Sequence, residues 1–390
     1  MASIRIVKDP DECAFLWQTY YPVECFFDLW QVRETFSQLY DRENNFIVYE
    51  ENGRVNGLLA LCRITETDEL AFFPGEIWNN RTWMEQNKII SKNNQIMSAM
   101  LHAVQGNAEI RYLCQESLNN VSLEMRDNCT VDQENFTVDQ ENFTVDQKNF
   151  TVDQENRTVD QKNQTVDQKN QTVDQKNQTV YEDNRTTDED NRTVYEYDSA
   201  NTLSVDEIGY LFYPEQYEYN YDRYLGVFAG KSRKKIMSEV NSIEKQGVSF
   251  RYDKPEDIDY LFQLNISNFG EHGYFHDPRF LNAFIRLAQN LHEKEMLRVV
   301  TVLVGNEVAA VDMGAVWNNT CTMIAGGTNK NFPGIAKLIN LHHMKWACVE
   351  KISSLDFLCG DFGWKKRFHL TPRPLYKINV HQKNQNTFSR

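Results

Sequence analysis

The sequence predicts an α/β (α+β) protein built from two related halves, each a mixed, mostly antiparallel sheet flanked by helices. Two observations lead to this prediction. A pattern of hairpin, helix and strand occurs twice along the chain. A heptapeptide repeat of different composition separates the two copies. The chain has 390 residues, which is longer than one typical domain of about 100 to 200 residues.

The first copy of the pattern begins with two apolar runs that flank a turn. Residues 46–50 (FIVYE) and 55–62 (VNGLLALC) are joined by an Asn-Gly pair, which is typical of a type I′ hairpin turn. Residues 93–104 then predict a helix, and residues 109–114 (EIRYLC) predict a strand.

The second copy lies after the repeat and has the same order. Residues 298–304 (RVVTVLV) and 307–316 form a hairpin through a Gly-Asn turn, and residues 320–327 (TCTMIAGG) extend it by a third strand. A helix over 334–351 and a strand over 355–360 (LDFLCG) follow. Two such copies indicate two related α/β halves.

The repeat between the halves has a unit of roughly N-x-T-V-D-Q-(E/K) and runs from Asn128 to Tyr197. Its apolar residues alternate at spacings of five and two, which does not match the three-and-four spacing of a coiled coil. From Arg157 onward about one Val per unit remains, too little apolar surface to offset the entropy of ordering. Disorder is favoured, and a thin stack of strands with Asn and Gln ladders stays the alternative.

The chain is therefore expected to consist of three parts. Residues 1–127 form an N-terminal half, residues 128–197 form the insertion, and residues 198–390 form a C-terminal half. Closing a long flexible loop costs only about 0.6 kcal/mol per doubling of its length, so a fold tolerates such an insertion. The function is expected on either side of it.

Charge and cysteine spacing exclude several classes of protein. The net charge is −15, and the repeat contributes 16 acidic and 7 basic side chains to it, so the remainder is only modestly acidic. That balance argues against a surface that follows nucleic-acid phosphates. The eight cysteines form no close pairs, which indicates neither a CxxC metal site nor a disulfide framework.

The sequence also lacks the patterns of secretion and membrane insertion. The stretch MASIRIVKDPDECAFLW has no continuous apolar core of a signal peptide. No later run approaches the roughly 20 apolar residues that span a bilayer. We expect a soluble, cytoplasmic protein with reduced thiols, no metal ion and no membrane span.

Several segments of the second half resemble a known family. The helix GKSRKKIMSEVNSIEKQG from Gly230, two helices from Ile258 to Glu293, the three-stranded meander and the ending LDFLCGDFGWKKRF together are similar to the double-GNAT, FemAB-like (CelD/BioF-type) acetyltransferases. The family ending has the pattern F-D-F-L-x-G-D-x-x-Y-K-x-x-F. The resemblance covers residues 222–381 well and the first 125 residues more loosely, and it does not cover the repeat.

The resemblance implies two tandem GNAT-like halves and an N-acyltransferase. Such an enzyme passes an acyl group from acetyl-CoA or another acyl-CoA to an amine of a small molecule or a cell-envelope precursor. Two alternatives remain open. One is an aminoacyl-tRNA-dependent ligase like other Fem proteins, for which the KSRKK cluster at residues 231–235 is the only dense basic patch, and tRNA the only nucleic acid expected. The other is a binding protein that kept the GNAT fold without turnover.

The stretch GGTNKNFPGIAK offers a site for the pyrophosphate of CoA. Helix N-termini bind anions through unpaired amides and the positive end of the helix dipole, and here a helix is expected to begin directly after a strand. The family's nucleotide loop lies at the same place. The residues assigned to the cofactor are Gly327, Thr328, Asn329, Lys330, Pro333 and Gly334.

Two further stretches carry candidate catalytic residues. NFGEHGYFHDP places Glu271 and His272 between two helices, where the resemblance puts the acceptor pocket and a side chain could take the amine's proton. GDFGWKKRF follows a strand at its carboxyl end, and there Asp361 is expected to orient the amine. Because Trp364 replaces the family's Tyr and has no hydroxyl, Lys365 is the nearest candidate to neutralise the leaving thiolate.

Overall fold

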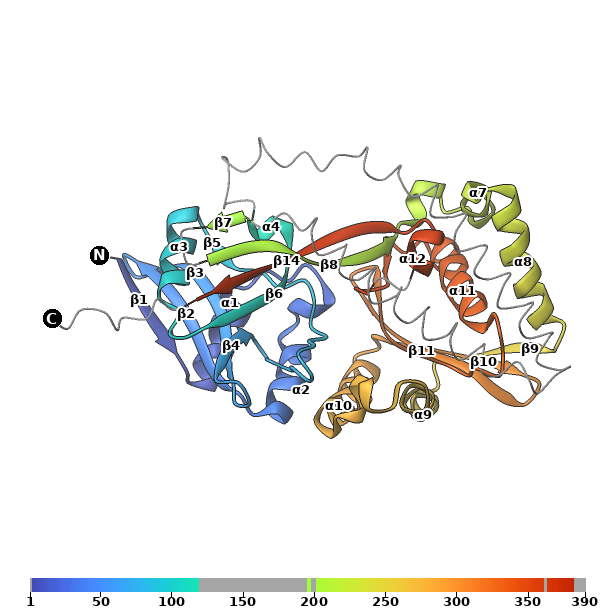
Figure 1. Ribbon diagram of the computed structural model, residues 1–390, viewed down its shortest axis with the longest axis horizontal. Coiled ribbons are helices and arrows are strands. Elements are labelled where there is room, and N and C mark those ends of the chain that lie inside the picture. Colours follow the sequence, from blue (N-terminus) through green and yellow to red (C-terminus); the bar gives the residue numbers. More distant parts are fainter. Residues whose placement is uncertain (1, 119–194, 198–200, 361–362, 382–390) are drawn as a thin grey trace, which may run out of the picture. The chain divides into compact units, whose positions relative to one another are not determined.

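The computed structural model describes residues 2–118, 195–197, 201–360 and 363–381, and it forms a mixed α/β fold around a large sheet (Figure 1). The elements before the insertion are β1 (Ala2–Val7), α1 (Pro10–Tyr20), α2 (Trp30–Tyr40), β2 (Glu43–Glu51), β3 (Arg54–Ile64), β4 (Glu69–Phe72), β5 (Ile90–Ser91), α3 (Asn94–His102), β6 (Ala108–Leu113) and α4 (Gln115–Leu118). The elements that follow it are β7 (Tyr195–Tyr197), β8 (Asn201–Phe212), α7 (Tyr221–Val227), α8 (Gly230–Glu244), β9 (Val248–Tyr252), α9 (Ile258–Phe269), α10 (Pro278–Glu293), β10 (Leu297–Val304), β11 (Glu307–Trp317), β12 (Thr320–Thr328), α11 (Ile335–Val349), β13 (Ser354–Asp356), α12 (Trp364–Arg367) and β14 (Thr371–Val380).

The strand order shows that the two halves repeat one arrangement. The sheet runs β1-β2-β3-β4-β6-β14-β8-β13-β12-β11-β10-β9. From either edge, four strands pair antiparallel and the fifth pairs parallel with the fourth, β6 with β4 in one half and β13 with β12 in the other. The predicted fold class, two α/β halves with mostly antiparallel sheets, is confirmed.

Two long strands join the sheets of the two halves. Strand β8 begins the second half and pairs with β13 of the same half. Strand β14 is the last described strand of the second half, yet it pairs with β6 of the first half. Strands β8 and β14 pair antiparallel with each other from Thr371↔Leu211 to Val380↔Asn201, so the halves share one sheet.

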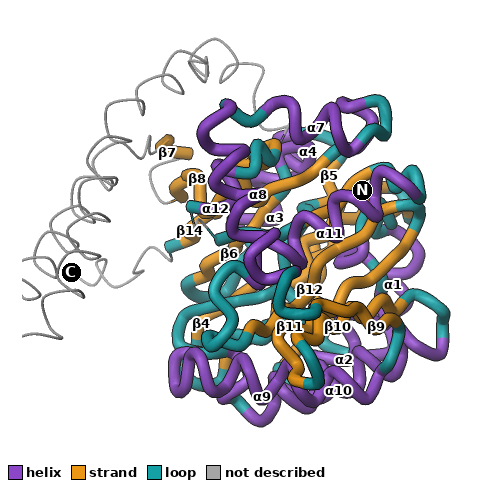
Figure 2. The backbone as a smooth tube through the Cα atoms, turned by 90° about the vertical axis from the view of Figure 1, so that its right-hand side faces the viewer, coloured by secondary structure: helices purple, strands orange, loops and turns teal. Residues whose placement is uncertain are grey.

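Helices cover both faces of the sheet in the second half. In Figure 2, α9 and α10 lie on one side of strands β9 to β12, and α8 and α11 lie on the other. Apolar side chains of β10 are available to helices on both faces, because successive side chains of a strand point to opposite faces of the sheet. Val300 and Val302 pack with the α11 residues Leu338 and Ile339, whereas Val299 packs with the α9 and α10 side chains.

The sequence of α10 shows why this helix begins where it does. The side chain of Asp277 accepts a hydrogen bond from the backbone N–H of Arg279 at 2.9 Å, and Pro278 occupies the first helical position, where no amide donor is needed. Its buried face includes Phe280 and Phe284, which contact Phe36 of α2 at ring-centroid distances of 5.6 and 5.9 Å. Aromatic packing therefore links the first half to the second.

The structure also tests the other helices and strands that the sequence predicts. The two hairpins are confirmed as β2–β3 and β10–β11, and the helices over 93–104 and 334–351 as α3 and α11. The strand expected over 355–360 is wrong in its extent, since β13 ends at Asp356 and a loop follows. The heptapeptide repeat lies outside the described residues, apart from the short strand β7 at its end.

Candidate active site

The parallel strands β12 and β13 stop pairing at their carboxyl ends. Residues 320–322 pair with residues 354–356, and no further pairs follow although β12 continues to Thr328. A register shift between β11 and β12 leaves Ile324 with no residue opposite it in β11. The two strands thus open at the edge where α/β sheets commonly bind ligands.

The loop after β12 contains the residues that the sequence assigns to CoA. Gly327 and Thr328 end the strand, and Asn329, Lys330 and Pro333 lead to Gly334, which caps α11 with a φ angle of 94°. Gly suits this left-handed conformation. Within the described residues, the amides of Gly334 and Ala336 have no hydrogen-bond partner, so the start of α11 presents donors to an anion.

The charges around the helix start are partly balanced by the protein itself. Lys337 forms an ion pair with Glu239 of α8. Lys330 is exposed, and its Nζ lies 3.5 Å from the carbonyl oxygen of Asn268. Lys330 is therefore the better placed of the two lysines to pair with a phosphate. The unpaired amides, the Gly334 conformation and Lys330 together fit a phosphate group.

Gly327 and Asn329 pack or bond against neighbouring elements of the protein. A Cβ atom on Gly327 would lie 2.9 Å from the carbonyl oxygen of Leu261, so the missing side chain lets α9 pack against β12. The backbone N–H of Asn329 donates to the carbonyl oxygen of Ala309 at 2.8 Å, and its side chain donates to Glu307 at 3.0 Å. Both residues shape the loop.

Residues 82–88, here called the bridging segment, come from the first half and lie against the open end of the two strands. The indole N–H of Trp83 donates to the carbonyl oxygen of Ile324 at 3.2 Å. The side chain of Gln86 donates to Asp356 at 2.9 Å, and Glu85 accepts from the backbone N–H of Cys359 at 2.7 Å. The bridging segment thus contacts both strands where they separate.

A buried group of two carboxylates and one guanidinium, here called the carboxylate cluster, lies at the end of β13. It consists of Glu85, Asp356 and Arg373. Arg373 donates to Asp356 at 2.9 Å, and its Nη2 is 3.7 Å from Oε2 of Glu85. Among the described residues, Asp356 accepts three hydrogen bonds, whereas Oε2 of Glu85 has no hydrogen-bond partner. One cation therefore faces two acids.

The surroundings of Glu85 raise the pKa of its carboxyl group. Burial raises the pKa of its carboxyl group to about 7, and the neighbouring Asp356 contributes to the rise while Arg373 opposes it. A carboxyl group with a pKa near neutrality is suited to take up and release a proton under ordinary conditions.

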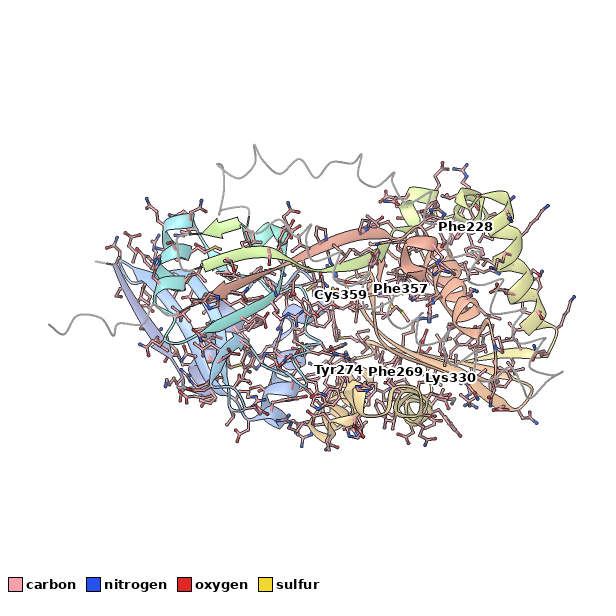
Figure 3. The ribbon with its side chains drawn as sticks, in the orientation of Figure 1. Phe228, Phe269, Tyr274, Lys330, Phe357 and Cys359 are labelled. Atoms are coloured by element: carbon pink, nitrogen blue, oxygen red, sulfur yellow. The ribbon has the colours of Figure 1, made fainter. Side chains whose placement is uncertain are left out.

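The side chain of Lys365 is buried near the carboxylate cluster. Its Nζ donates to the carbonyl oxygens of Leu358 at 2.8 Å and Cys359 at 2.7 Å. The adjacent Trp364 packs edge-on against Phe357 and Phe368, with centroid distances of 5.5 Å to each. Both residues therefore hold the loop after β13, which Figure 3 marks by Phe357 and Cys359.

Replacing Lys365 by Met is expected to destabilise the protein. The two carbonyl oxygens would lose their donor in a buried place, and an unsatisfied buried polar group costs about 1–3 kcal/mol. We expect a loss of about 2–4 kcal/mol in the free energy of unfolding, measured by urea denaturation. An unchanged midpoint would show that water replaces the ammonium group.

The loop between α9 and α10 carries Glu271 and His272, and both side chains are exposed. Arg81 donates to the carbonyl oxygen of His272 at 3.0 Å, and the hydroxyl of Tyr274 donates to the carbonyl oxygen of Thr82 at 3.0 Å. These bonds bring the loop to the bridging segment. Figure 3 labels Tyr274 in this loop, and Phe269 and Lys330 in neighbouring segments. Asp361 lies outside the described residues.

The thiol of Cys359 adjoins Glu85 but is not activated. Burial raises its pKa well above the ordinary value, and the Glu85 carboxylate raises it further. Since the thiolate is the nucleophilic form, this cysteine stays unreactive.

Reasoning from the sequence missed Glu85, Gln86, Asp356 and Arg373. Glu85 and Asp356 are separated by 271 residues in the chain, and Arg373 follows on β14. No local pattern marks Glu85, which stands in the unremarkable run WMEQNK. Only the contact between the halves gives this residue its environment.

Part of the second half is similar to a known family of domains. Residues 230–366 match the family model of the acetyltransferase (GNAT) domain, which includes the open pair β12–β13 and the start of α11. A search among curated proteins gave no match. None of the described helices is both long and apolar enough to cross a bilayer. In the same part of the chain, no three His, Cys, Asp or Glu side chains are grouped to hold a metal ion.

Solved structures with a similar chain course have low identity. A conserved protein of unknown function from Bacteroides thetaiotaomicron is 9% identical, with a TM-score of 0.48, and the match covers 97% of this chain and 100% of that one. FemX is 9% identical with a TM-score of 0.48 and 97% of each chain covered. A tandem GNAT protein from the clavulanic acid pathway is 8% identical with a TM-score of 0.44, covering 98% of this chain and 100% of the other.

Proposed function

We propose that the protein is an N-acyltransferase that passes an acyl group, other than an aminoacyl group, from acyl-CoA to an amine of a small molecule or a cell-envelope precursor. One observation carries this proposal. The open ends of β12 and β13 lie between a helix start suited to phosphate and a buried carboxyl group with a pKa of about 7. The match of this region to the GNAT acetyltransferase domain supports it.

The backbone of the loop from Asn329 to Gly334, the first amides of α11 and Lys330 hold the pyrophosphate in this proposal. When bound, CoA supplies the acyl group as a thioester. Phe269, which is 53% exposed, ends α9 beside Asn268, the contact of Lys330. The aromatic ring offers an apolar surface next to the cationic group.

The acceptor amine attacks the acyl carbon directly, so that an N–C bond forms, the C–S bond breaks and CoA leaves as the thiolate. Glu85 takes the proton that the amine loses, because its carboxyl group has a pKa of about 7, close to the pH of the surrounding solution. Cys359 is unsuited to carry the acyl group, since its thiol stays protonated. Transfer therefore proceeds without a covalent enzyme intermediate.

The other candidates from the sequence take supporting roles in this proposal. Glu271 and His272, exposed in the loop that contacts the bridging segment, meet the incoming acceptor. Asp361 orients the amine, as the family pattern implies. Lys365 positions the loop after β13 through its two carbonyl bonds, and its charge lies near the cluster.

Binding of CoA is tested most directly by thermal stabilisation of the full chain. Acetyl-CoA at about 100 times its dissociation constant should add about 2.7 kcal/mol to the free energy of unfolding. Ala336→Glu is expected to remove this shift, because the exposed side chain would place a negative charge in the first turn of α11. The same charge favours the helix itself, so the melting temperature without ligand should not fall.

Ala336→Gln is the matched control, since it adds the same bulk without charge, and it should keep most of the shift. An equal shift in Ala336→Glu would place the pyrophosphate elsewhere. Absence of any shift in the unaltered protein, with acetyl-CoA and longer acyl-CoA compounds, would contradict an acyl-CoA donor.

A further inference from the structure

A groove beside α11 contains a buried arginine that forms no ion pair with any carboxylate of the described residues. The groove has a volume of about 360 Å³ and is lined by Tyr252, Arg298, His342, Lys345, Trp346 and Val349. Arg298 comes from the beginning of β10 and is only 9% exposed. Its Nε and Nη2 atoms are buried without hydrogen-bond partners, and none of the described residues forms an ion pair with it.

The contact that Arg298 does make is too weak to explain its burial. The guanidinium carbon lies 3.6 Å from the ring centroid of Trp346. A cation–π contact of this kind is worth less than the cost of leaving two buried donors without partners, as Nε and Nη2 of Arg298 are. The burial of Arg298 is therefore unfavourable unless a further group joins the site.

Comparison with other buried arginines supports this interpretation. Burial alone would lower the pKa of Arg373 and Arg111, but the carboxylates beside them raise it. The pKa of Arg298 is lowered, because burial dominates and the carboxylates of Asp253 and Glu350 are too distant to form an ion pair. Asp253 instead accepts a hydrogen bond from the backbone N–H of Val299 at 3.2 Å. The guanidinium is thus an uncompensated cation.

The other residues that line the groove determine which kind of ligand it can bind. His342 stacks on Phe250 at a centroid distance of 4.0 Å and is within 3.3 Å of the Tyr252 hydroxyl. Burial lowers the pKa of His342 to about 4, and His343, Arg298 and Lys345 contribute, so its imidazole is neutral near pH 7. Lys345 adds a second, exposed cation, and Val349 is 68% exposed. The walls are aromatic and apolar, and the charges are positive.

We propose that this groove is a binding site for a small organic carboxylate with a flat, apolar body. The carboxylate pairs with Arg298 and Lys345, and the apolar body lies against Trp346, Tyr252 and Val349. Nε and Nη2 form one edge of the guanidinium, and such an edge binds both oxygens of a carboxylate with two parallel hydrogen bonds. Because Nε and Nη2 are buried, the proposal requires the side chain of Arg298 to rotate when the carboxylate binds.

The site is separate from the proposed CoA site. Arg298 stands at the beginning of β10, whereas the loop from Asn329 to Gly334 adjoins the other end of the sheet, where Asn329 bonds to Ala309. Lys345 is ten residues beyond Ile335, roughly 15 Å along the helix axis. The proposal therefore does not depend on acyl transfer.

Benzoate is the probe for the test, which uses isothermal titration of the full chain. Benzyl alcohol, which keeps the ring without charge, and acetate, which keeps the charge without a ring, are the comparison ligands. Benzoate is expected to bind at least about tenfold more tightly than either one, because only benzoate uses both the cation and the apolar walls. Equal affinity for benzoate and benzyl alcohol, or no benzoate binding at about 10 mM, would overturn the proposal.

Three variants assign the binding to the groove. Arg298→Met should weaken benzoate binding at least about tenfold, with an unchanged or higher melting temperature because an uncompensated charge is removed. Lys345→Glu, at an exposed position, should also weaken it without affecting folding. Lys351→Met, just beyond the end of α11 and outside the groove, is the control and should bind normally. Undiminished binding in both Arg298→Met and Lys345→Glu would show that benzoate binds elsewhere.

Discussion

Replacing Glu85 by Gln is expected to lower kcat for acyl transfer by about 10²-fold or more, since a positioned general base typically contributes about 10²- to 10⁴-fold. The amide has nearly the same shape, and its oxygen can still accept the hydrogen bond from the backbone N–H of Cys359. What it cannot do is take a proton from the amine. The loss should therefore appear in turnover and not in folding.

The measurement is thiol release from acetyl-CoA across a panel of amines, from about pH 5 to about pH 9. In the unaltered protein kcat/KM should rise with pH and level off above an apparent pKa near 7, the value that burial gives to Glu85. Glu85→Gln should lose this step. Glu109→Gln on β6, whose carboxylate is exposed and pairs with Lys377 at 3.3 Å, is the control and should keep the normal profile. A normal profile in Glu85→Gln would refute the assignment of this carboxyl as the base.

The same carboxyl group makes stability depend on pH. Its pKa is raised by folding to about 7, so the protonated form is the one that the folded state favours. This contribution is fully present below the pKa of the unfolded chain and is lost as the pH rises through about 7. The melting temperature of the unaltered protein should thus fall, relative to that of Glu85→Gln, between about pH 5 and about pH 8.

Arg373→Met is expected to give the largest loss of stability, about 3–5 kcal/mol in the free energy of unfolding. The change would leave Asp356 and Glu85 buried beside each other without the cation that now lies between them. Gly209 of β8 shows how closely the guanidinium is packed, because a Cβ atom there would lie 3.0 Å from its Nη2. Urea denaturation at about pH 8, above the pKa of about 7 that Glu85 has in the unaltered protein, measures the effect best.

The double variant Arg373→Met with Glu85→Gln separates charge from packing. It should be more stable than Arg373→Met alone, because only one buried acid then remains, and the two changes should not be additive. Arg367→Met, at an exposed position whose Nε contacts the carbonyl oxygen of Gly363 at 3.1 Å, should have little effect. Strict additivity of Arg373→Met and Glu85→Gln would show that the two side chains do not interact.

Local patterns were sufficient to predict much of the fold. Both hairpins, the helix α11 and the loop before it follow from alternation, turn residues and the Pro-Gly pair at residues 333–334, all of which act over a few residues. The extent of β13 was overestimated, because the apolar run LDFLCG continues beyond Asp356 into a loop that Lys365 stabilises. The pairing of β14 with β6 was not predictable, because it joins strands that lie far apart in the chain.

The residues of the candidate site were likewise predicted only in part. The position of the loop between β12 and α11 was predicted because a helix start and its preceding strand are adjacent in sequence. That this loop binds phosphate stays a prediction. Glu85 was missed because its raised pKa arises from burial under residues of the other half and from the neighbouring Asp356. Asp361 and the insertion lie outside the described residues, so their predicted roles still stand as predictions.

The position of β14 affects the synthesis of the chain. This strand follows every other described strand in sequence, yet it lies in the interior of the sheet, between β6 and β8. Until β14 has left the ribosome, β6 and β8 both expose unpaired backbone groups, which other chains can bind. The central part of the sheet therefore closes only after β14 has been synthesised, and until then the growing chain is exposed to aggregation at β6 and β8.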